Sequence, residues 1–217
     1  PQGPLATAGT AQNRRGTAVT FCPDPQIFGE KPYFRPSTLY RMARSKAYLF
    51  AGVEIRWRCD PALLANDDPV PAEAVLHYPG GLSDYLNDAT ADTALLVSTP
   101  FADLVELDGQ KFEWAITWLG AGEEGFFHSY CNTVPTPSGG THEAGFRQAI
   151  TRALRSFGDL AGNRKAAEIT ADDVFAGTAV MLSVFLRDPQ FQGQTKDRLV
   201  SADAARQTEQ AARDRFE

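Results

Sequence analysis

The sequence predicts an α+β fold, in which helices and strands are mixed along the chain and pack as layers. Three stretches carry this prediction. Large apolar residues alternate from Phe112 to Trp118 as in a half-buried strand, an amphipathic pattern with helical spacing fills 141–160, and β-branched and large apolar residues fill 178–187. Strand, long helix, brief helix and strand in this order imply a sheet that helices cover.

The first eighty residues are expected to contain one helix and three strands. Prolines and glycines separate these elements, as they do where a chain turns. The expected elements are a strand at 17–21, a helix at 37–50, a strand at 53–59 and a strand at 74–78. The run Pro79-Gly80-Gly81 then marks a boundary between two domains, residues 1–81 and residues 82–217.

The second domain is expected to mix strands and helices. Its expected elements are a short helix at 82–87, strands at 112–118 and 126–133, a helix at 141–160, a brief helix capped by Thr170 and Asp173, a strand at 178–187, an irregular loop at 188–196 and a helix from Ser201. The turn at 120–125 predicts that the first two strands pair as a hairpin.

Composition limits the classes of function. The chain has 217 residues, of which 43% are hydrophobic, enough for a substantial core. Its 21 basic and 27 acidic residues give a net charge of -6, so contact with nucleic acid needs a local basic patch. The few cysteines and histidines exclude a disulfide scaffold and show no metal-ligand spacing; they are Cys22, Cys59, Cys131, His77, His128 and His142.

We expect a cytoplasmic protein without a membrane segment. The most apolar run, 179–186, is far shorter than the ~18 to 20 residues that span a bilayer, and no basic-then-apolar leader opens the chain. The chain begins at Pro1 and ends at Glu217 inside an expected helix, so we also expect it to be a piece of a longer protein.

The helix at 141–160 has two distinct faces. Six apolar side chains fall in one arc of roughly 140°: Phe146, Ala149, Ile150, Ala153, Leu154 and Phe157. The opposite arc carries Arg147, Arg152 and Arg155. The residues alone leave three readings of this arc open, namely a solvated face, a partner surface or a stripe that follows phosphates.

The loop at 192–196 is the candidate phosphate contact. Gly193 allows close backbone approach, Lys196 offers a compact positive charge, and Gln194 could donate an amide hydrogen bond beside it. The spacing is not that of a Walker loop. Strand alternation puts His128 and Cys131 on opposite faces, so we expect no cysteine nucleophile with a base there. The residues alone yield no catalytic constellation.

Four runs of sequence together resemble a known family. They are, in chain order, GTAVTFCPDPQIF at 16–28, HYPGGL at 77–82, SYCNTVPTPSGGTHEAGFR at 129–147 and DPQFQGQTKDRL at 188–199. Over nearly the whole chain they resemble the ATPase subunit of bacterial type IIA DNA topoisomerases. The run ARSKA at 43–47, followed by GVEI at 52–55, is more similar to the topoisomerase IV branch of that family than to the gyrase branch.

The resemblance implies a fold in two parts. Residues 1–81 would be the closing part, or remnant, of a GHKL-type ATP-binding sandwich. Residues 82–217 would be a transducer domain, ending within the helix that leads to the DNA gate. In this family the transducer is a two-layer α+β sandwich with a left-handed strand–helix–strand crossover, against the usual right-handed preference.

The resemblance also implies roles for single residues. Gln194 and Lys196 match the loop that touches the γ-phosphate of ATP, which makes Lys196 the candidate catalytic residue, and Thr17 matches a threonine of the adenine pocket. Arg147 matches a basic residue that faces a DNA-filled cavity, which favours the DNA-facing reading of Arg152 and Arg155. The family's general base and Mg²⁺-holding asparagine precede this sequence, so the chain alone is expected not to hydrolyse ATP.

The implied function is that of a fragment of an ATP-dependent topoisomerase that decatenates or relaxes DNA by double-strand passage. The implied partners are ATP with Mg²⁺ held outside this chain, DNA, the cleavage subunit of topoisomerase IV (its A-type polypeptide) and a homodimer partner in the ATP-bound state. The alternative is a self-contained α+β module that binds a protein through the arginine helix or a sheet edge and has no nucleotide role.

Overall fold

A five-stranded mixed sheet is the framework of the larger of two compact units, Pro1–Arg35 and Pro36–Glu217. The computed structural model describes residues 6–7, 9–10, 15–29, 33–64 and 69–216. The strands of this sheet are β3 Phe101–Leu107, β4 Gln110–Trp118, β5 Phe126–Cys131, β6 Val134–Pro135 and β7 Thr178–Phe185. They lie in the order β3-β4-β7-β5-β6, with β5 and β7 parallel and the other neighbours antiparallel.

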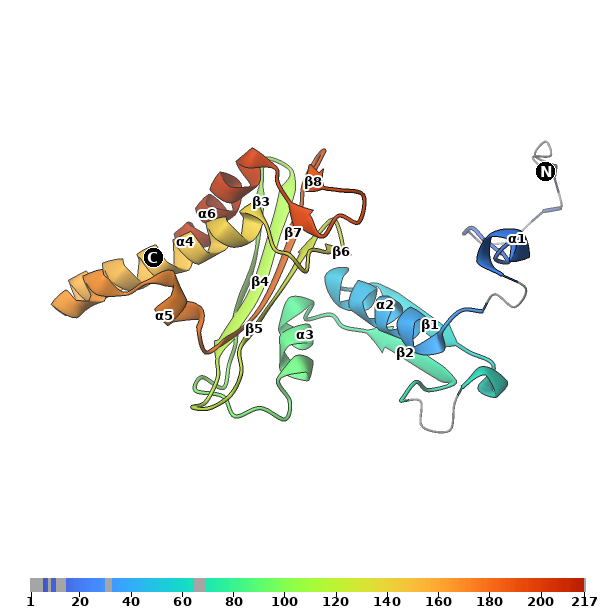
Figure 1. The fold of residues 1–217 in the computed structure, drawn as a ribbon, viewed down its shortest axis with the longest axis horizontal. Coiled ribbons are helices and arrows are strands. Elements are labelled where there is room, and N and C mark those ends of the chain that lie inside the picture. The colour runs from blue at the N-terminus through green and yellow to red at the C-terminus, as the bar shows by residue number, and fades with distance from the viewer. Residues whose placement is uncertain (1–5, 8, 11–14, 30–32, 65–68, 217) are drawn as a thin grey trace. The chain divides into compact units, whose positions relative to one another are not determined.

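Helices cover both faces of this sheet (Figure 1). Their bounds are α2 Pro36–Leu49, α3 Leu82–Ala89, α4 Thr141–Leu160, α5 Ala171–Phe175 and α6 Ala202–Phe216, with short 3-10 turns η1 Pro61–Leu63 and η2 Arg164–Glu168. Helices α4 and α6 pack on one face, over the alternating side chains Phe112, Trp114 and Ile116 of β4. On the other face, α3 buries Leu82 and Leu86. The predicted α+β class is confirmed, but helices lie on both faces of the sheet, so the expected two layers become three.

The predicted hairpin between β4 and β5 is wrong. Strand β7 lies between them, antiparallel to β4 and parallel to β5. Parallel neighbours need a crossover connection, and the chain supplies it through α4 on the way from β5 to β7. The turn at 120–125 favours local pairing, but the long apolar strand β7 takes the central place. The strand–helix–strand crossover is confirmed, and its left hand stays a prediction.

One member of the predicted apolar arc of α4 lies outside the core. Phe157 is 69% exposed, whereas Phe146, Ala149 and Ile150 are fully buried. The last turn of α4 runs past the sheet and α6 in Figure 1, so the helical pattern continues where no partner layer remains.

Two small two-stranded sheets lie outside the main sheet. In one, β1 (Glu54–Arg58) pairs antiparallel with β2 (Glu73–His77), which confirms the two strands expected there. In the other, β8 (Phe191–Gln192) pairs antiparallel with β9 (Arg198–Leu199), where only an irregular loop was expected. Among the described residues of the smaller unit, 17–21 forms no strand, because a ladder needs a neighbouring strand and none is present there.

Residues 36–81 pack on the rest of the larger unit. The ring of Tyr48 on α2 is stacked between Tyr78 and Tyr85, with centroid distances of 3.7 and 4.3 Å. The ammonium of Lys46 donates to the carbonyl and the hydroxyl of Thr133 in the β5–β6 turn. These contacts explain why the compact units divide after Arg35. The functional boundary at 81/82 stays a prediction.

Candidate functional site

The loop that carries Gln194 and Lys196 is the tip of the β8–β9 hairpin. Gly193 has a φ of 75° and Lys196 a φ of 61°, the left-handed conformation that lets the chain reverse direction. The Thr195 hydroxyl donates to the Asp197 carboxylate at 2.7 Å inside the turn. The segment between the two short strands is therefore an ordered turn.

Gln194 and Lys196 are both exposed at this tip. The Lys196 ammonium lies 5.7 Å from the centre of the Phe191 ring, within the range of a cation–π contact. Such a contact orients the ammonium without neutralising its charge. The tip can thus offer a lysine and an amide side by side to an anion such as a phosphate.

A second segment, the 136–140 strap, holds the base of the hairpin. Three hydrogen bonds join them: Ser138 N–H to the Asp197 carbonyl at 2.9 Å, Arg198 Nη1 to the Ser138 carbonyl at 3.0 Å, and Leu199 N–H to the Gly139 carbonyl at 3.1 Å. At Gly140, whose φ is 146°, an added Cβ would lie 2.3 Å from the Leu199 carbonyl oxygen. Only glycine permits this approach, which explains the Gly-Gly pair in the motif.

A buried polar network lies beneath the strap. The Ser129 hydroxyl is 2.6 Å from the Thr136 hydroxyl and donates to the Glu143 carboxylate at 2.8 Å. The Thr136 hydroxyl is also 3.1 Å from Nε2 of His142, which is fully buried. Burial raises the pKa of Glu143, while the Ser129 hydrogen bond and the charges of Arg147 and Arg198 oppose that rise. Strand β5, the strap and α4 are thereby tied together.

Lowering the pH is expected to weaken the fold through His142. Burial lowers its pKa to about 4 from the ordinary 6.5, so between pH 6.5 and 4 the unfolded chain binds a proton that the folded chain does not. As the pH is lowered across this window, the free energy of unfolding decreases by at most ~1.4 kcal/mol per pH unit. Urea unfolding between pH 4 and 7 measures the free energy of unfolding at each pH. That free energy should depend less steeply on pH in His142→Gln than in the wild type. Equal slopes would contradict a buried neutral imidazole, since contributions from other groups cancel in the comparison.

The three arginines of the predicted arc line one hollow on α4. The hollow has a volume of about 390 Å³. Besides the arginines it is lined by Ala144, Gln148, Thr151 and Ala171. The Arg147 guanidinium lies 4.8 Å from the ring centre of Phe127 and 4.6 Å from that of Phe175. Two aromatic faces therefore hold Arg147 in place while leaving its charge available.

Arg152 and Arg155 have polar partners. Arg152 forms an ion pair with Glu209 of α6 at 2.6 Å, and Arg155 Nε donates to the Ile169 carbonyl at 2.7 Å. A carboxylate partner offsets the charge of Arg152, whereas a carbonyl leaves that of Arg155 intact. The structure thus brings the three predicted residues together, and Arg147 and Arg155 keep most of the hollow's positive field.

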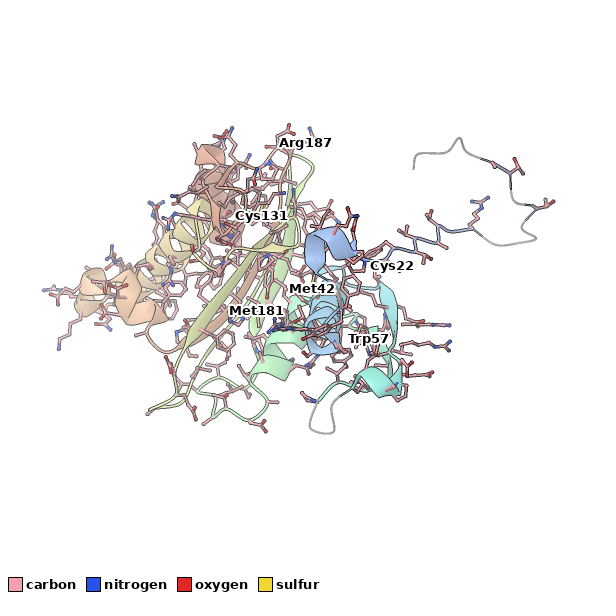
Figure 2. All side chains as sticks on the ribbon, turned by 45° about the vertical axis from the view of Figure 1, so that its right-hand side comes forward. Cys22, Met42, Trp57, Cys131, Met181 and Arg187 are labelled. Carbon is pink, nitrogen blue, oxygen red and sulfur yellow. The ribbon has the colours of Figure 1, made fainter. Side chains whose placement is uncertain are left out.

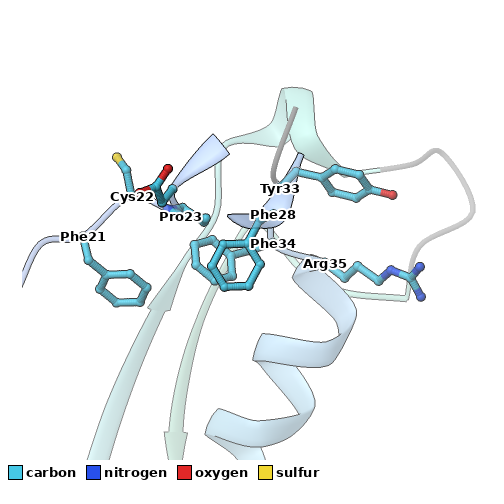
Figure 3. A pocket seen from close by; sticks show the side chains of 8 residues that line it. Phe21, Cys22, Pro23, Phe28, Tyr33, Phe34 and Arg35 are labelled. Carbon is cyan, nitrogen blue, oxygen red and sulfur yellow. The ribbon is translucent and has the colours of Figure 1, made fainter. Parts of the chain in front are cut away.

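Thr17, the candidate adenine contact, belongs to the smaller unit, where it is exposed and lies outside any helix or strand. The same unit has an apolar hollow of about 500 Å³ with the rings of Phe21, Phe28 and Phe34 around it (Figure 3). The Asp24 carboxylate beside it accepts from the Gln26 N–H at 2.8 Å and caps α1 (Pro25–Phe28). We assign no ligand to this hollow.

The buried cysteine of the central sheet offers no reactive thiol. Cys131 lies in the central sheet and is fully buried, and burial raises its pKa to about 12, so its thiol stays protonated (Figure 2). Among the described residues no three metal-ligand side chains gather at one place. No described helix has the length and apolar character that crossing a bilayer requires.

Sequence patterns do not reveal Ser129, Thr136 and His142 as a group. In the sequence, His142 is noticed only as one of three histidines that show no metal-ligand spacing. The three side chains come from β5, the strap and α4, and no spacing rule links them. The one available signal is the Gly-Gly-Thr-His run, in which two glycines precede a histidine at a helix start.

The main sheet, the β8–β9 hairpin and the arginine helix α4 all lie within residues that one family model matches. The family model described as DNA gyrase B matches residues 81–217, and the chain belongs to this family. The predicted resemblance to the ATPase subunit of bacterial type IIA topoisomerases is confirmed.

Relatives named as the B subunit of DNA topoisomerase 4 are similar over the whole chain. The protein of Bartonella bacilliformis is 49% identical over 219 residues, which cover 100% of this chain and 31% of the relative. That of Caulobacter vibrioides is 48% identical over 222 residues, with 100% and 32% covered. The chain therefore spans about a third of the length of these curated relatives.

Solved structures share the fold. The 43K ATPase domain of Thermus thermophilus gyrase B, in complex with an aminocoumarin, has a TM-score of 0.71 at 29% identity, covering 89% of this chain and 50% of that one. The topoisomerase IV ATP-binding domain of Francisella tularensis, in complex with a small-molecule inhibitor, has a TM-score of 0.70 at 25% identity, covering 87% and 49%.

Proposed function

We propose that this chain is the coupling segment of the ATP-hydrolysing subunit of a type IIA DNA topoisomerase, of the topoisomerase IV type. The whole protein would decatenate and relax DNA by passing one double strand through another. The observation that carries the proposal is the exposed Lys196 on an ordered hairpin, whose base is hydrogen-bonded to the strap. The identities of 49% and 48% to B subunits of DNA topoisomerase 4 support the topoisomerase IV type.

Lys196 and Gln194 would contact the γ-phosphate of ATP, and Thr17 would contact its adenine. ATP has a γ-phosphate and ADP has none, so a contact made only there gives the two nucleotides different affinities for the closed arrangement of the domains. Only such a difference lets a ligand shift a conformational equilibrium. The Mg²⁺ that accompanies ATP would be held by residues outside this chain, and the 217 residues alone would not hydrolyse ATP.

The proposed domains follow the same division. Residues 1–81 would close the GHKL ATP-binding domain, and residues 82–217 would be the transducer, whose last helix α6 leads to the DNA gate. The family match, which begins at residue 81, supports this boundary. The main-chain N–H of Leu82 donates to the half-buried Glu113 carboxylate at 2.9 Å, so the first turn of α3 is anchored to β4.

The proposed partners are DNA, the A-type cleavage subunit of topoisomerase IV, and a second copy of the ATPase subunit in the ATP-bound state. DNA would lie against the hollow of Arg147, Arg152 and Arg155, where local positive charge outweighs the chain's net charge of -6. The protein would act in the cytoplasm, where bacterial DNA is found.

The test uses the full-length subunit with its cleavage subunit. We expect interlinked DNA circles to be separated in the presence of ATP, and not with ADP or without nucleotide. We also expect the full-length subunit to turn over ATP and the 217-residue chain alone not to do so. Separation of circles without ATP, or no separation at all, would contradict the proposal and favour the interaction module.

Substituting Arg147 with glutamine is expected to weaken the stimulation of ATP turnover by DNA while turnover without DNA is kept. The loss of one phosphate contact should reduce the slope of log binding constant against log salt by ~0.9. DNA binding and ATP turnover measured between about 50 and 200 mM salt, the range over which phosphate contacts lose much of their affinity, check this. The control Arg164→Gln removes an equally charged, exposed side chain from η2 and should change neither. Equal loss of both activities in Arg147→Gln would indicate a structural role instead.

A further inference from the structure

The position of Lys196 depends on the 136–140 strap. The hairpin has only two short pairing strands of its own, and its exposed tip is joined to the rest of the protein through the strap hydrogen bonds at its base. The side chain of Leu199, which ends the hairpin, is fully buried and fixes one end. A shift of the strap would therefore move the base of the hairpin and the lysine with it.

The strap in turn depends on the side chain of Thr136, which is only 1% exposed. Its hydroxyl is shared between Ser129 of β5, at 2.6 Å, and His142 of α4, at 3.1 Å. Its main chain adds bonds on both sides, donating to the Ser129 carbonyl at 2.9 Å and accepting from Gly139 N–H at 2.8 Å. One buried hydroxyl thus ties the strap to the sheet and to the helix layer.

The network also reaches the charged groups around the strap. Ser129 donates to the carboxylate of Glu143, and that carboxylate lies so close to Gly139 that an added Cβ would be 2.8 Å from one of its oxygens. A buried network of this kind allows few alternative arrangements, because a buried polar atom that loses its partners is costly. The strap is therefore held in one register.

We propose that Thr136, through Ser129 and His142, is a positioning residue for the loop that carries Lys196. The inference rests on the proposed function. A strap held in one register presents the lysine where the γ-phosphate arrives, so that little ordering accompanies nucleotide binding. Thr136 itself touches no nucleotide and acts only through the strap.

The experiment compares two threonine-to-valine variants in the full-length subunit. Valine keeps the shape of threonine and replaces the hydroxyl with a methyl group. Thr178→Val is the control, since Thr178 is 2% exposed, donates to the Phe175 carbonyl at 3.1 Å and lies at the end of β7 remote from the hairpin. The rate of hydrogen exchange of the amides at 191–199 measures how firmly the loop is held. Steady-state kinetics measure KM and kcat for ATP.

We expect Thr136→Val to speed amide exchange at 191–199 and to raise KM for ATP by about 2- to 10-fold with kcat little changed, as the loss of a single hydrogen bond implies. Thr178→Val should leave both unchanged. Thr136→Ser restores the hydroxyl and should restore exchange and KM together. Should Thr136→Val fail to fold, Ser129→Ala removes the same link from the strand side together with the bond to Glu143, and faster exchange at 191–199 with a raised KM is again the expected result.

Equal behaviour of the two valine variants, in exchange and in KM, would overturn the inference, because Thr136 would then only contribute to packing. The variant Lys196→Ala is measured alongside. Full ATP turnover in Lys196→Ala would instead overturn the proposed function, and exchange at 191–199 would still show whether Thr136 holds the loop.

Discussion

Lys196→Ala in the full-length subunit is expected to lower ATP-driven strand passage by about 10- to 150-fold while the fold stays intact. A hydrogen bond to a charged group contributes ~1.5 to 3 kcal/mol, which converts to that range of rates. The side chain is exposed, and alanine keeps the Cβ, so the left-handed backbone at φ 61° gains no new strain. Decatenation assays and ATP turnover measure the loss, and thermal unfolding checks the fold.

The matched control for this prediction is Lys165→Ala. Lys165 is also exposed and lies on η2, outside the hairpin and the strap. It should retain both activities. Decatenation by Lys196→Ala at the rate of this control would remove the lysine from the mechanism.

Lys196 cannot close the domains alone. Moving a two-state population from 1:99 to 99:1 takes ~5.5 kcal/mol, about two to four times what one charge-assisted contact provides. Gln194, the proposed dimer contact and the residues outside this chain would have to supply the remainder. This division of the free energy explains why the lysine variant is expected to slow the cycle rather than abolish nucleotide binding.

The elements that the sequence predicts well are those set by local patterns. The bounds of α4, Thr141–Leu160, are predicted to the residue because a long periodic pattern is flanked by Gly139-Gly140 and ends before Gly162. The capping box of Thr170 and Asp173 is likewise predicted from the sequence, and both of its hydrogen bonds are formed. Local hydrogen bonding decides such features, and distant residues change them little.

The pairing of strands cannot be read from local patterns. Strand β7 separates β4 from β5 although 59 residues follow Trp118 before it begins at Thr178. The sequence predicts no strand where β3 lies, because its alternate side chains are at most partly buried and its apolar pattern is weak. Sheet order depends on which strands bury most together, and that is a property of the whole domain.

The candidate site divides in the same way. The Gln194–Lys196 turn and the arginines of α4 are found because motif and periodicity mark them. The Thr136 network is not found in this way, because its members share no spacing pattern and come together only when the chain folds. The strand predicted at 17–21 shows the opposite error, in which a local β pattern has no partner strand among the described residues.

Gly145→Ala is expected to destabilise the larger unit by ~1 to 3 kcal/mol, the usual cost of overpacking a core. An added Cβ at Gly145 would lie 2.1 Å from the Ala205 carbonyl oxygen, and a helix backbone cannot rotate aside as a side chain can. Helices α4 and α6 would have to separate, which outweighs the gain of ~1 kcal/mol in helix propensity. Urea unfolding followed by tryptophan fluorescence measures the change, since Trp114 packs against α4. Gly177→Ala, where no atom lies within 4 Å of the added Cβ, should be nearly neutral. A neutral Gly145→Ala would mean that α4 and α6 do not pack at this distance.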